Sequence, residues 1–253
     1  MTINAGAIFA TSVYSFIYFL LVIIIIIPQQ SKSKGYHMFK HYISAPAEKF
    51  QIKFKDSIEE ITVVKLDQAP SYFKQIVDLL ESKSIHLKTM NKIGFIDING
   101  TFKNKVESLE IVAASHQVIN EELLANSTEL TEEALVNLKN SDGSNKRFVL
   151  CASNIFNVFD EQNEFIGSLT LNDCQHYGKS IQSIVFALIN FGFTIVPDHQ
   201  ANECGEGFID NYGKYLTRSE AYTIAKLSDQ PFNDTYTLSG NLLDSSCIRH
   251  IAK

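Results

Sequence analysis

The chain has 253 residues, and its 22 Lys/Arg and 28 Asp/Glu side chains give a formal net charge of −6. A hydrophobic content of 45%, with 18 Phe and 10 Tyr, excludes an intrinsically disordered chain, because disordered chains are poor in these residues. Only 12 Gly and 5 Pro are present, too few for a collagen-like or low-complexity protein. Binding to a nucleic-acid backbone needs a concentrated basic face, so this acidic balance predicts no nucleic-acid partner.

The N-terminal 30 residues carry no charged side chain. Residues 5–27 are long enough, as a helix of about 35 Å, to cross a hydrocarbon core of about 30 Å. A cleaved signal peptide would show a basic start and a small-residue cleavage site, which this segment lacks. A buried core helix is the other alternative. We expect a transmembrane anchor in residues 1–30, with membrane lipid as its partner, and a stem in residues 31–44.

Basic residues follow this anchor but do not precede it: Lys32, Lys34 and Lys40 lie just after the apolar segment. The positive-inside rule therefore predicts a single-pass membrane protein whose C-terminal part lies in the cytosol. Met38 is an alternative start that would give a product without the anchor.

An internal repeat is the clearest pattern in the chain. Residues 94–117 and 207–230 align without a gap at an offset of 113, with nine of 24 positions identical where chance gives one or two. The identical pairs include Gly94/Gly207, Asp97/Asp210, Gly100/Gly213, Glu107/Glu220 and Gln117/Gln230. We expect an α/β (α+β) fold of two duplicated modules, residues 45–140 and 145–253, each built of short strands, a hairpin and helices.

The repeated residues have a local structural explanation. Asp-x-x-Gly predicts a turn in which Asp accepts backbone N–H groups and Gly takes a positive φ. Thr217 with Glu220 predicts a capping box, and Asn104 with Glu107 a close variant of one, so both pairs are expected to begin helices. We therefore interpret the shared acids as turn and cap residues, with a catalytic carboxylate pair as the alternative.

The other elements are predicted from apolar periodicity and turn signals. Helices are expected at 70–82 and 179–190 and in part of 121–138. Strands are expected at 50–54, 60–66, 94–97, 147–152, 164–171 and 193–196.

Four cysteines lie in the second module, without a Cys-x-x-Cys spacing, and a cytosolic location would keep them reduced. Cys151 falls on a predicted buried strand and is interpreted as a small hydrophobic residue. Two thiolates and two imidazoles would satisfy tetrahedral zinc. The candidate ligands are Cys174, His176, His199 and Cys204. Unlinked loop residues are the alternative, and no other cofactor is expected.

A second candidate site centres on His176, which precedes a predicted helix that begins at Lys179. Helix N-termini favour anions, and Lys214 and Arg218 lie at another strand–helix junction of the same module. If the two junctions converge, His176, Lys179 and Arg218 would be catalytic, with Lys214 binding a phosphate-bearing ligand. A solvated loop histidine with surface cations is the alternative. No Walker loop, GxGxxG, GxSxG or HExxH motif occurs.

The second module also resembles small uncharacterised proteins of bacteriophages and bacteria, in which a central motif reads GF-x4-GRF-x2-R-x-EA. The resemblance rests on residues 148–153, the His-containing loop at 174–176, and residues 207–221 with Gln230. Two departures are Lys214 in place of the motif's Arg, and residues 243–247, which lack the family's closing Glu-Asp pair.

Taken together, these patterns favour a membrane-anchored, two-module binding or interaction protein, whose partner is another protein or a small phosphate-bearing ligand. An enzyme acting on a nucleotide or phosphate ester through the second module is the first alternative, and a zinc-stabilised module is the second. The first module has no His equivalent to His176, so it is expected to be a structural or pseudo-active copy.

Overall fold

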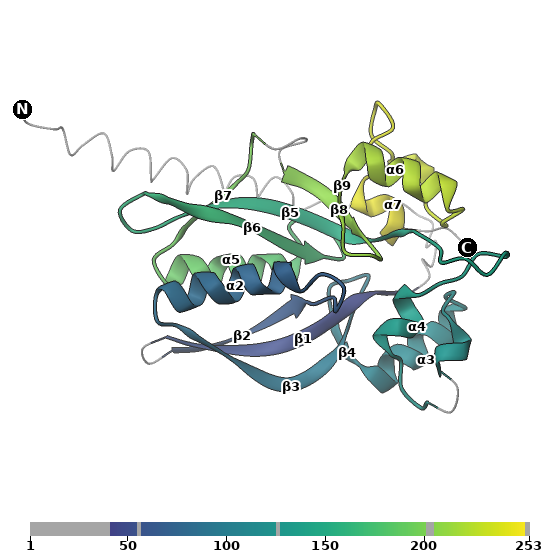
Figure 1. Ribbon diagram of the computed structural model, residues 1–253, viewed down its shortest axis with the longest axis horizontal. Helices are drawn as coiled ribbons and strands as arrows, with labels where there is room; N and C mark the ends of the chain where they lie inside the picture. The colour runs from purple at the N-terminus through teal and green to yellow at the C-terminus, as the bar shows by residue number, and fades with distance from the viewer. Residues whose placement is uncertain (1–40, 55–56, 125–126, 201–204, 251–253) are drawn as a thin grey trace, which may run out of the picture. The chain divides into compact units, whose positions relative to one another are not determined.

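The computed structural model describes residues 41–54, 57–124, 127–200 and 205–250. Residues 38–253 form one compact unit of mixed α and β structure, with two antiparallel sheets and six α-helices in the described part (Figure 1). The predicted anchor at residues 5–27 lies outside the described residues. Within the described ranges, no helix has the length and apolar character needed to cross a membrane.

The first sheet has the strand order β2-β1-β3-β4. Its strands are β1 (Ile43–Phe54), β2 (Ser57–Val64), β3 (His86–Asp97) and β4 (Phe102–Asn104). Helix α2 (Pro70–Ser82) connects β2 to β3, and α3 (Lys105–Ser115) follows β4 directly. A 3-10 turn at Glu121–Leu124 and the short helix α4 (Glu132–Val136) complete this part.

The second sheet has the order β6-β5-β8-β9, and β7 pairs with the far end of β5. Its strands are β5 (Val149–Phe159), β6 (Phe165–Asp173), β7 (Thr194–Pro197), β8 (Glu206–Asp210) and β9 (Tyr215–Thr217). Helix α5 (Lys179–Asn190) connects β6 to β7, and α6 (Arg218–Leu227) follows β9. A 3-10 turn at Asp234–Tyr236 precedes α7 (Ser245–Arg249).

The bounds of α2 and α5 are those predicted from the sequence. Pro70 at the first position of α2 and Gly178 before α5 give both helices clear N-termini. Strand β3 is longer than predicted: it begins at His86 rather than at Gly94. The first eight residues of β3 are mostly exposed. An exposed strand segment needs no alternation of apolar and polar residues, so the sequence pattern did not reveal it.

Both Asp-x-x-Gly turns form as predicted. Oδ1 of Asp97 accepts two backbone N–H groups of its turn at 2.8 and 2.9 Å, and Oδ1 of Asp210 accepts two at 3.0 and 2.8 Å. The second carboxylate oxygen of Asp97 binds the ring of His41 at 2.8 Å, and that of Asp210 binds the guanidinium of Arg147 at 2.6 Å. His41 and Arg147 each lie two residues before the first strand of their sheet. Since all of these oxygens have partners, the turn interpretation is confirmed.

The two predicted capping boxes are also confirmed. The side chain of Asn104 accepts the N–H of Glu107 at 2.9 Å, and Glu107 accepts the N–H of Asn104 at 2.9 Å. Thr217 and Glu220 exchange the equivalent bonds at 3.2 and 2.9 Å. These bonds satisfy backbone donors that the first helical turn leaves without partners.

The repeated glutamines hold the first strand of each sheet. The amide of Gln117 accepts from the N–H of Ile43 at 2.8 Å and donates to the carbonyl of Ile43 at 2.8 Å. Gln230 makes the same two bonds to Val149, at 2.9 and 2.8 Å. Each glutamine therefore ties the end of α3 or α6 to the start of β1 or β5 through one accepted and one donated hydrogen bond.

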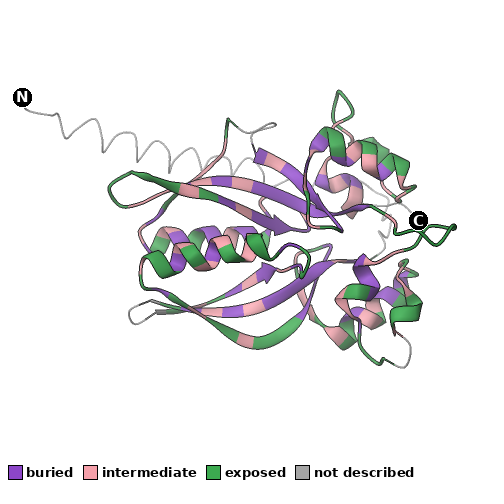
Figure 2. Ribbon diagram, in the orientation of Figure 1, coloured by how far each residue is buried: buried purple, intermediate pink, exposed green. Residues whose placement is uncertain are grey.

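The two halves of the compact unit pack on one another through reciprocal contacts. Helix α2 contacts β6, and α5 contacts β2; both helices lie between the sheets in Figure 1. Thr170 donates its N–H to the Gln75 side chain at 2.9 Å, and the Asn190 amide donates to Glu59 at 3.1 Å. Purple, buried segments run along β1 and β5 and along one side of each helix (Figure 2). A single apolar core accordingly includes residues from both halves.

The repeated turn glycines take part in this packing. Gly100 has φ +68°, and its turn lies against Cys174. A Cβ added to Gly100 would lie 3.6 Å from the Sγ atom of Cys174. Gly213 has φ +76°, and an added Cβ would lie 2.4 Å from the Cβ of Ala69, just before α2. Each turn thus lies against the segment that precedes the connecting helix of the other half, and the second contact leaves no room for a side chain.

Candidate functional site

His176 lies in the loop between β6 and α5, and its ring is partly buried against β8. Its Nε2 lies 2.7 Å from the carbonyl oxygen of Gly207, and its ring meets that of Phe208 edge-on, with 5.1 Å between centroids. Its Nδ1 lies 3.5 Å from Nη2 of Arg218, the first residue of α6. The structure therefore brings together two of the predicted site residues, His176 and Arg218.

The surroundings of His176 fix its protonation. A carbonyl oxygen only accepts hydrogen bonds, so Nε2 carries the proton and Nδ1 presents its lone pair to the guanidinium. Burial, and then the charge of Arg218, lower the pKa of His176 to about 4. The imidazole is neutral near pH 7, with its Nε2 bonded to the Gly207 carbonyl and its Nδ1 facing the guanidinium of Arg218.

Arg218 is only 7% exposed and joins three elements. It forms an ion pair with Glu206 at the start of β8, and its Nη1 lies 3.2 Å from Oδ2 of Asp244, the cap residue of α7. Buried guanidinium groups are stable only with such partners. The cluster of His176, Glu206, Arg218 and Asp244 therefore connects α6, α7 and β8 through charge.

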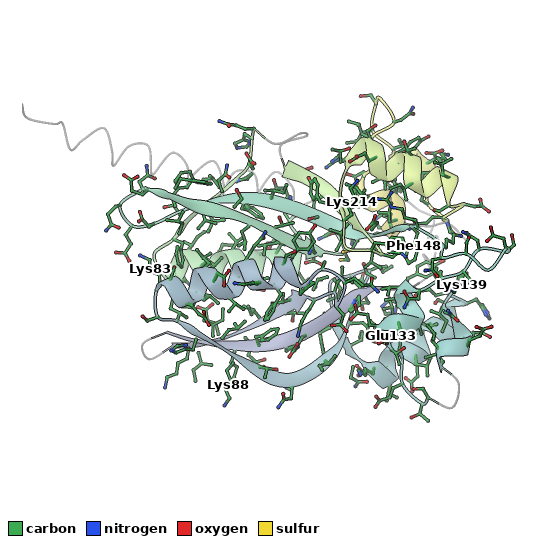
Figure 3. The ribbon with its side chains drawn as sticks, viewed as in Figure 1. Lys83, Lys88, Glu133, Lys139, Phe148 and Lys214 are labelled. Carbon is green, nitrogen blue, oxygen red and sulfur yellow. The ribbon has the colours of Figure 1, made fainter. Side chains whose placement is uncertain are left out.

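The two lysines predicted for the same site lie elsewhere. Lys214 is exposed at the turn between β8 and β9, where its backbone N–H bonds Asp210 (Figure 3). Lys179 is exposed at the N-terminus of α5, and its Cβ lies 3.8 Å from the position of a Cβ added to Gly100. Among the described contacts, neither lysine side chain reaches the His176–Arg218 pair.

The predicted zinc ligands do not gather in the described part of the chain. Cys174 is 4% exposed in the core, and burial raises the pKa of its thiol, which disfavours the thiolate that zinc needs. His199 is exposed beyond β7, and Cys204 lies outside the described residues. Of the described side chains, no three His, Cys, Asp or Glu are placed to share a metal. The zinc set therefore stays a prediction. Cys151, 2% exposed on β5, is a core residue as predicted.

The neutral, partly buried His176 predicts that the free energy of unfolding depends on pH. Its folded pKa of about 4 lies below the value of about 6.5 for an unfolded chain, so between these values the unfolded state binds more protons. The contribution of His176 to the free energy of unfolding is complete above pH 6.5 and decreases by about 3 kcal/mol as the pH falls to 4. Urea unfolding of His176→Gln is expected to show a shallower slope over this window. His199→Gln, at an exposed site, should keep the wild-type slope; equal slopes for all three proteins would contradict the prediction.

A cavity of about 400 Å³ lies where the two halves meet, at the starts of β1 and β5. Phe148, labelled in Figure 3, lies at this junction. Equivalent positions of the repeat line it from both sides. These pairs are Tyr42/Phe148, Ile43/Val149, Ser44/Leu150, His116/Asp229, Gln117/Gln230, Val118/Pro231 and Leu135/Ile248. The volume falls within the range of small-molecule sites, roughly 300–1,000 Å³.

A β-bulge on each side shapes this cavity. The β1–β3 register shifts between Ile43 and Ala45, and the β5–β8 register shifts between Val149 and Cys151. The extra residues are therefore Ser44 and Leu150, and both line the cavity. Because a bulge redirects the side chain of its extra residue, the repeated fold directs two side chains of different polarity toward one space.

Two cations also line the cavity. Arg249 at the end of α7 donates from Nε to the carbonyl of Ile98 at 2.8 Å and from Nη1 to Gln175. Lys146 precedes β5. Within the described residues, neither Nη2 of Arg249 nor the ammonium of Lys146 has a hydrogen-bond or ion-pair partner. Both residues belong to the lining, so these are the cationic groups that a ligand of the cavity could meet.

Sequence reasoning did not identify this cavity. Its lining comes from the strand starts, the repeat ends and the last helix, which are far apart in the chain and carry no recognised motif. The repeated pair Gln117 and Gln230 was the one signal that pointed to it, since both residues lie at its edge.

The family model described as "Phage T4 y16D protein" matches residues 148–246. The match extends from the start of β5 into α7, and it includes the whole cluster around Arg218 but neither Lys146 nor Arg249. This part of the chain is thus similar to a phage protein family. The comparisons with curated proteins and with solved structures give no match.

Proposed function

We propose that this chain is a ligand-binding protein whose site is the cavity between its two halves. The observation that carries the proposal is the lining itself: seven pairs of equivalent positions converge on one space of about 400 Å³. A cavity of this size with partner-free cations at its wall is suited to a small molecule.

The proposal includes a duplicated origin for the two halves. Three observations support it: the same Asp turns, the same capping boxes and the same glutamine-to-strand bonds recur at an offset of 113 or 106 residues. The reciprocal contacts between α2, β6, α5 and β2 are those of two copies packed face to face. Residues 5–27 are proposed to anchor this unit to a membrane, with the unit in the cytosol.

The alternative functions have less support. A nucleotide or phosphate-ester enzyme using His176, Lys179 and Arg218 requires all three side chains in one site, whereas only His176 and Arg218 are in contact among the described residues. A zinc-stabilised module requires thiolates, whereas burial raises the pKa of Cys174. The His176–Arg218 cluster is better explained as a structural connection between helices and sheet.

Dye binding tests the proposed function. The full chain, kept in lipid nanodiscs because of residues 5–27, is titrated with the fluorescent anion anilinonaphthalene sulfonate against empty nanodiscs. Ser44→Leu fills the cavity with the side chain that the second half carries at the equivalent Leu150. We expect this variant to weaken dye binding at least about fivefold, because one methylene in an apolar pocket is worth about 1–3 kcal/mol. The control Thr194→Leu, at an exposed position of β7, should bind as wild type. Equal binding by Ser44→Leu and wild type would refute the cavity as the site.

A further inference from the structure

We infer that the cavity binds an amphipathic anion: a small molecule with one carboxylate-type head group and an apolar body. This inference rests on the proposed function and adds the chemical class of its ligand. It follows from three features of the wall, namely its cations, its apolar surfaces and the unequal polarity of its two sides.

The cations define the head group. Lys146 and Arg249 bring two positive charges to the wall, and the one acidic side chain among the lining residues, Asp229, is exposed at the edge. Two bonds hold the guanidinium of Arg249 in place, to Ile98 and Gln175. A guanidinium held by two bonds, together with a second cation among the lining residues, is suited to a carboxylate, because charge-assisted hydrogen bonds are stronger than neutral ones.

The apolar wall defines the body. Leu135, Leu138, Phe148, Leu150 and Ile248 contribute hydrocarbon surface. Each of the two lining glutamines bonds the backbone of a strand residue through one N–H and its carbonyl oxygen. An inorganic anion alone would leave this surface exposed to water, whereas a ligand with an aromatic or aliphatic body would bury it, at about 25 cal/mol per Å².

The unequal sides of the cavity argue against a symmetric ligand. The first half contributes hydroxyl groups at Tyr42 and Ser44, and the second half contributes Phe148 and Leu150 at the equivalent positions. Burial raises the pKa of Tyr42, so its hydroxyl stays protonated and able to donate. The two halves therefore repeat the backbone geometry but present hydroxyl groups on one side and hydrocarbon groups on the other. We expect a ligand that has one polar and one apolar end.

Three compounds with one body and different head groups test the inference. Isothermal titration calorimetry of the full chain in nanodiscs, with empty nanodiscs as the blank, compares 2-naphthoate, 2-naphthylmethanol and 2-naphthylmethylammonium. We expect 2-naphthoate to bind about tenfold more tightly than the alcohol and the ammonium compound to bind most weakly. Lys146→Gln should remove most of this preference, and Lys146→Arg should keep it. Lys139→Gln, an exposed lysine outside the lining, is the matched control and should behave as wild type.

Each outcome has a separate meaning. If the carboxylate and the alcohol bind equally, and Ser44→Leu weakens both, the cavity is a binding site but the anionic class is wrong. Tighter binding of the ammonium compound would also overturn the class. If Lys146→Gln leaves the preference for 2-naphthoate unchanged, Lys146 does not bind the head group and the inferred two-cation site is wrong. If none of the three compounds binds and the dye titration is insensitive to Ser44→Leu, the proposed function itself fails.

Discussion

Replacing Arg218 with Met is expected to lower the free energy of unfolding by about 3 kcal/mol. The substitution keeps much of the apolar stem but leaves Glu206 and Asp244 without their cation, and breaking a buried pair costs about 3–5 kcal/mol. The side chains of Glu206 and Asp244 are about a quarter exposed, so water partly stabilises their charges. The expected loss is therefore at the lower end of this range of about 3–5 kcal/mol. Urea unfolding of the full chain in nanodiscs, followed by circular dichroism, measures the change.

The repeat supplies the matched control for this prediction. Lys105 begins α3 at the position equivalent to Arg218, and among the described residues its side chain has no ion-pair partner. Lys105→Met should change stability by less than about 1 kcal/mol, as is usual for such sites. Adding Glu206→Gln and Asp244→Asn to Arg218→Met should recover part of the loss, because the unpaired charges disappear. Equal effects of Arg218→Met and Lys105→Met would show that the cluster does not stabilise the fold.

Replacing Gly213 with Ala is expected to destabilise the protein by about 3 kcal/mol or more. The left-handed φ of +76° costs about 1–2 kcal/mol for any residue with a Cβ. The added Cβ would also lie 2.4 Å from the Cβ of Ala69 and 3.3 Å from its Cα, so the segment before α2 must move. Overpacking of this kind typically adds 1–3 kcal/mol.

Two other glycines separate the cost of the positive φ from the cost of the clash with Ala69. Gly100→Ala places its Cβ in ordinary contact, 3.5 Å from the nearest atom, and Gly143→Ala meets nothing within 4 Å, while both have positive φ. Each should therefore lose only about 1–2 kcal/mol from strain. Adding Ala69→Gly to Gly213→Ala should restore part of the loss by removing one of the clashing atoms. If Gly213→Ala is no worse than Gly143→Ala, the close approach of the two halves at this turn is not present in solution.

The elements that the sequence predicted correctly are those governed by neighbours in the chain. A capping box and an Asp-x-x-Gly turn each need residues only three positions apart, and Pro70 fixes the start of α2 by its own geometry. Strand β3 was predicted too short because its exposed half takes its conformation from pairing with β1, which is more than 30 residues away. Local propensity carries little information on such pairing.

The candidate sites show the same difference between features set by neighbours in the chain and features set by distant residues. Sequence spacing placed His176 and Arg218 near two strand–helix junctions, and those junctions do meet. Spacing did not reveal that Gly207 and Arg218 occupy both imidazole nitrogens, or that Lys179 and Lys214 lie on other surfaces. The chemical state of a histidine depends on atoms within a few ångströms, and chain separation does not predict these.

The sequence by itself determined that one pattern of turn, cap and glutamine is used twice, because each of these features is built from residues close together along the chain. Only the tertiary structure decided what the repetition produces. Packing the two halves against each other gives Gly100 and Gly213 their close neighbours and brings the bulge residues Ser44 and Leu150 to one cavity. The physical reason is that a cavity belongs to the space between elements, and that space is set by the packing of both halves rather than by the order of residues in either.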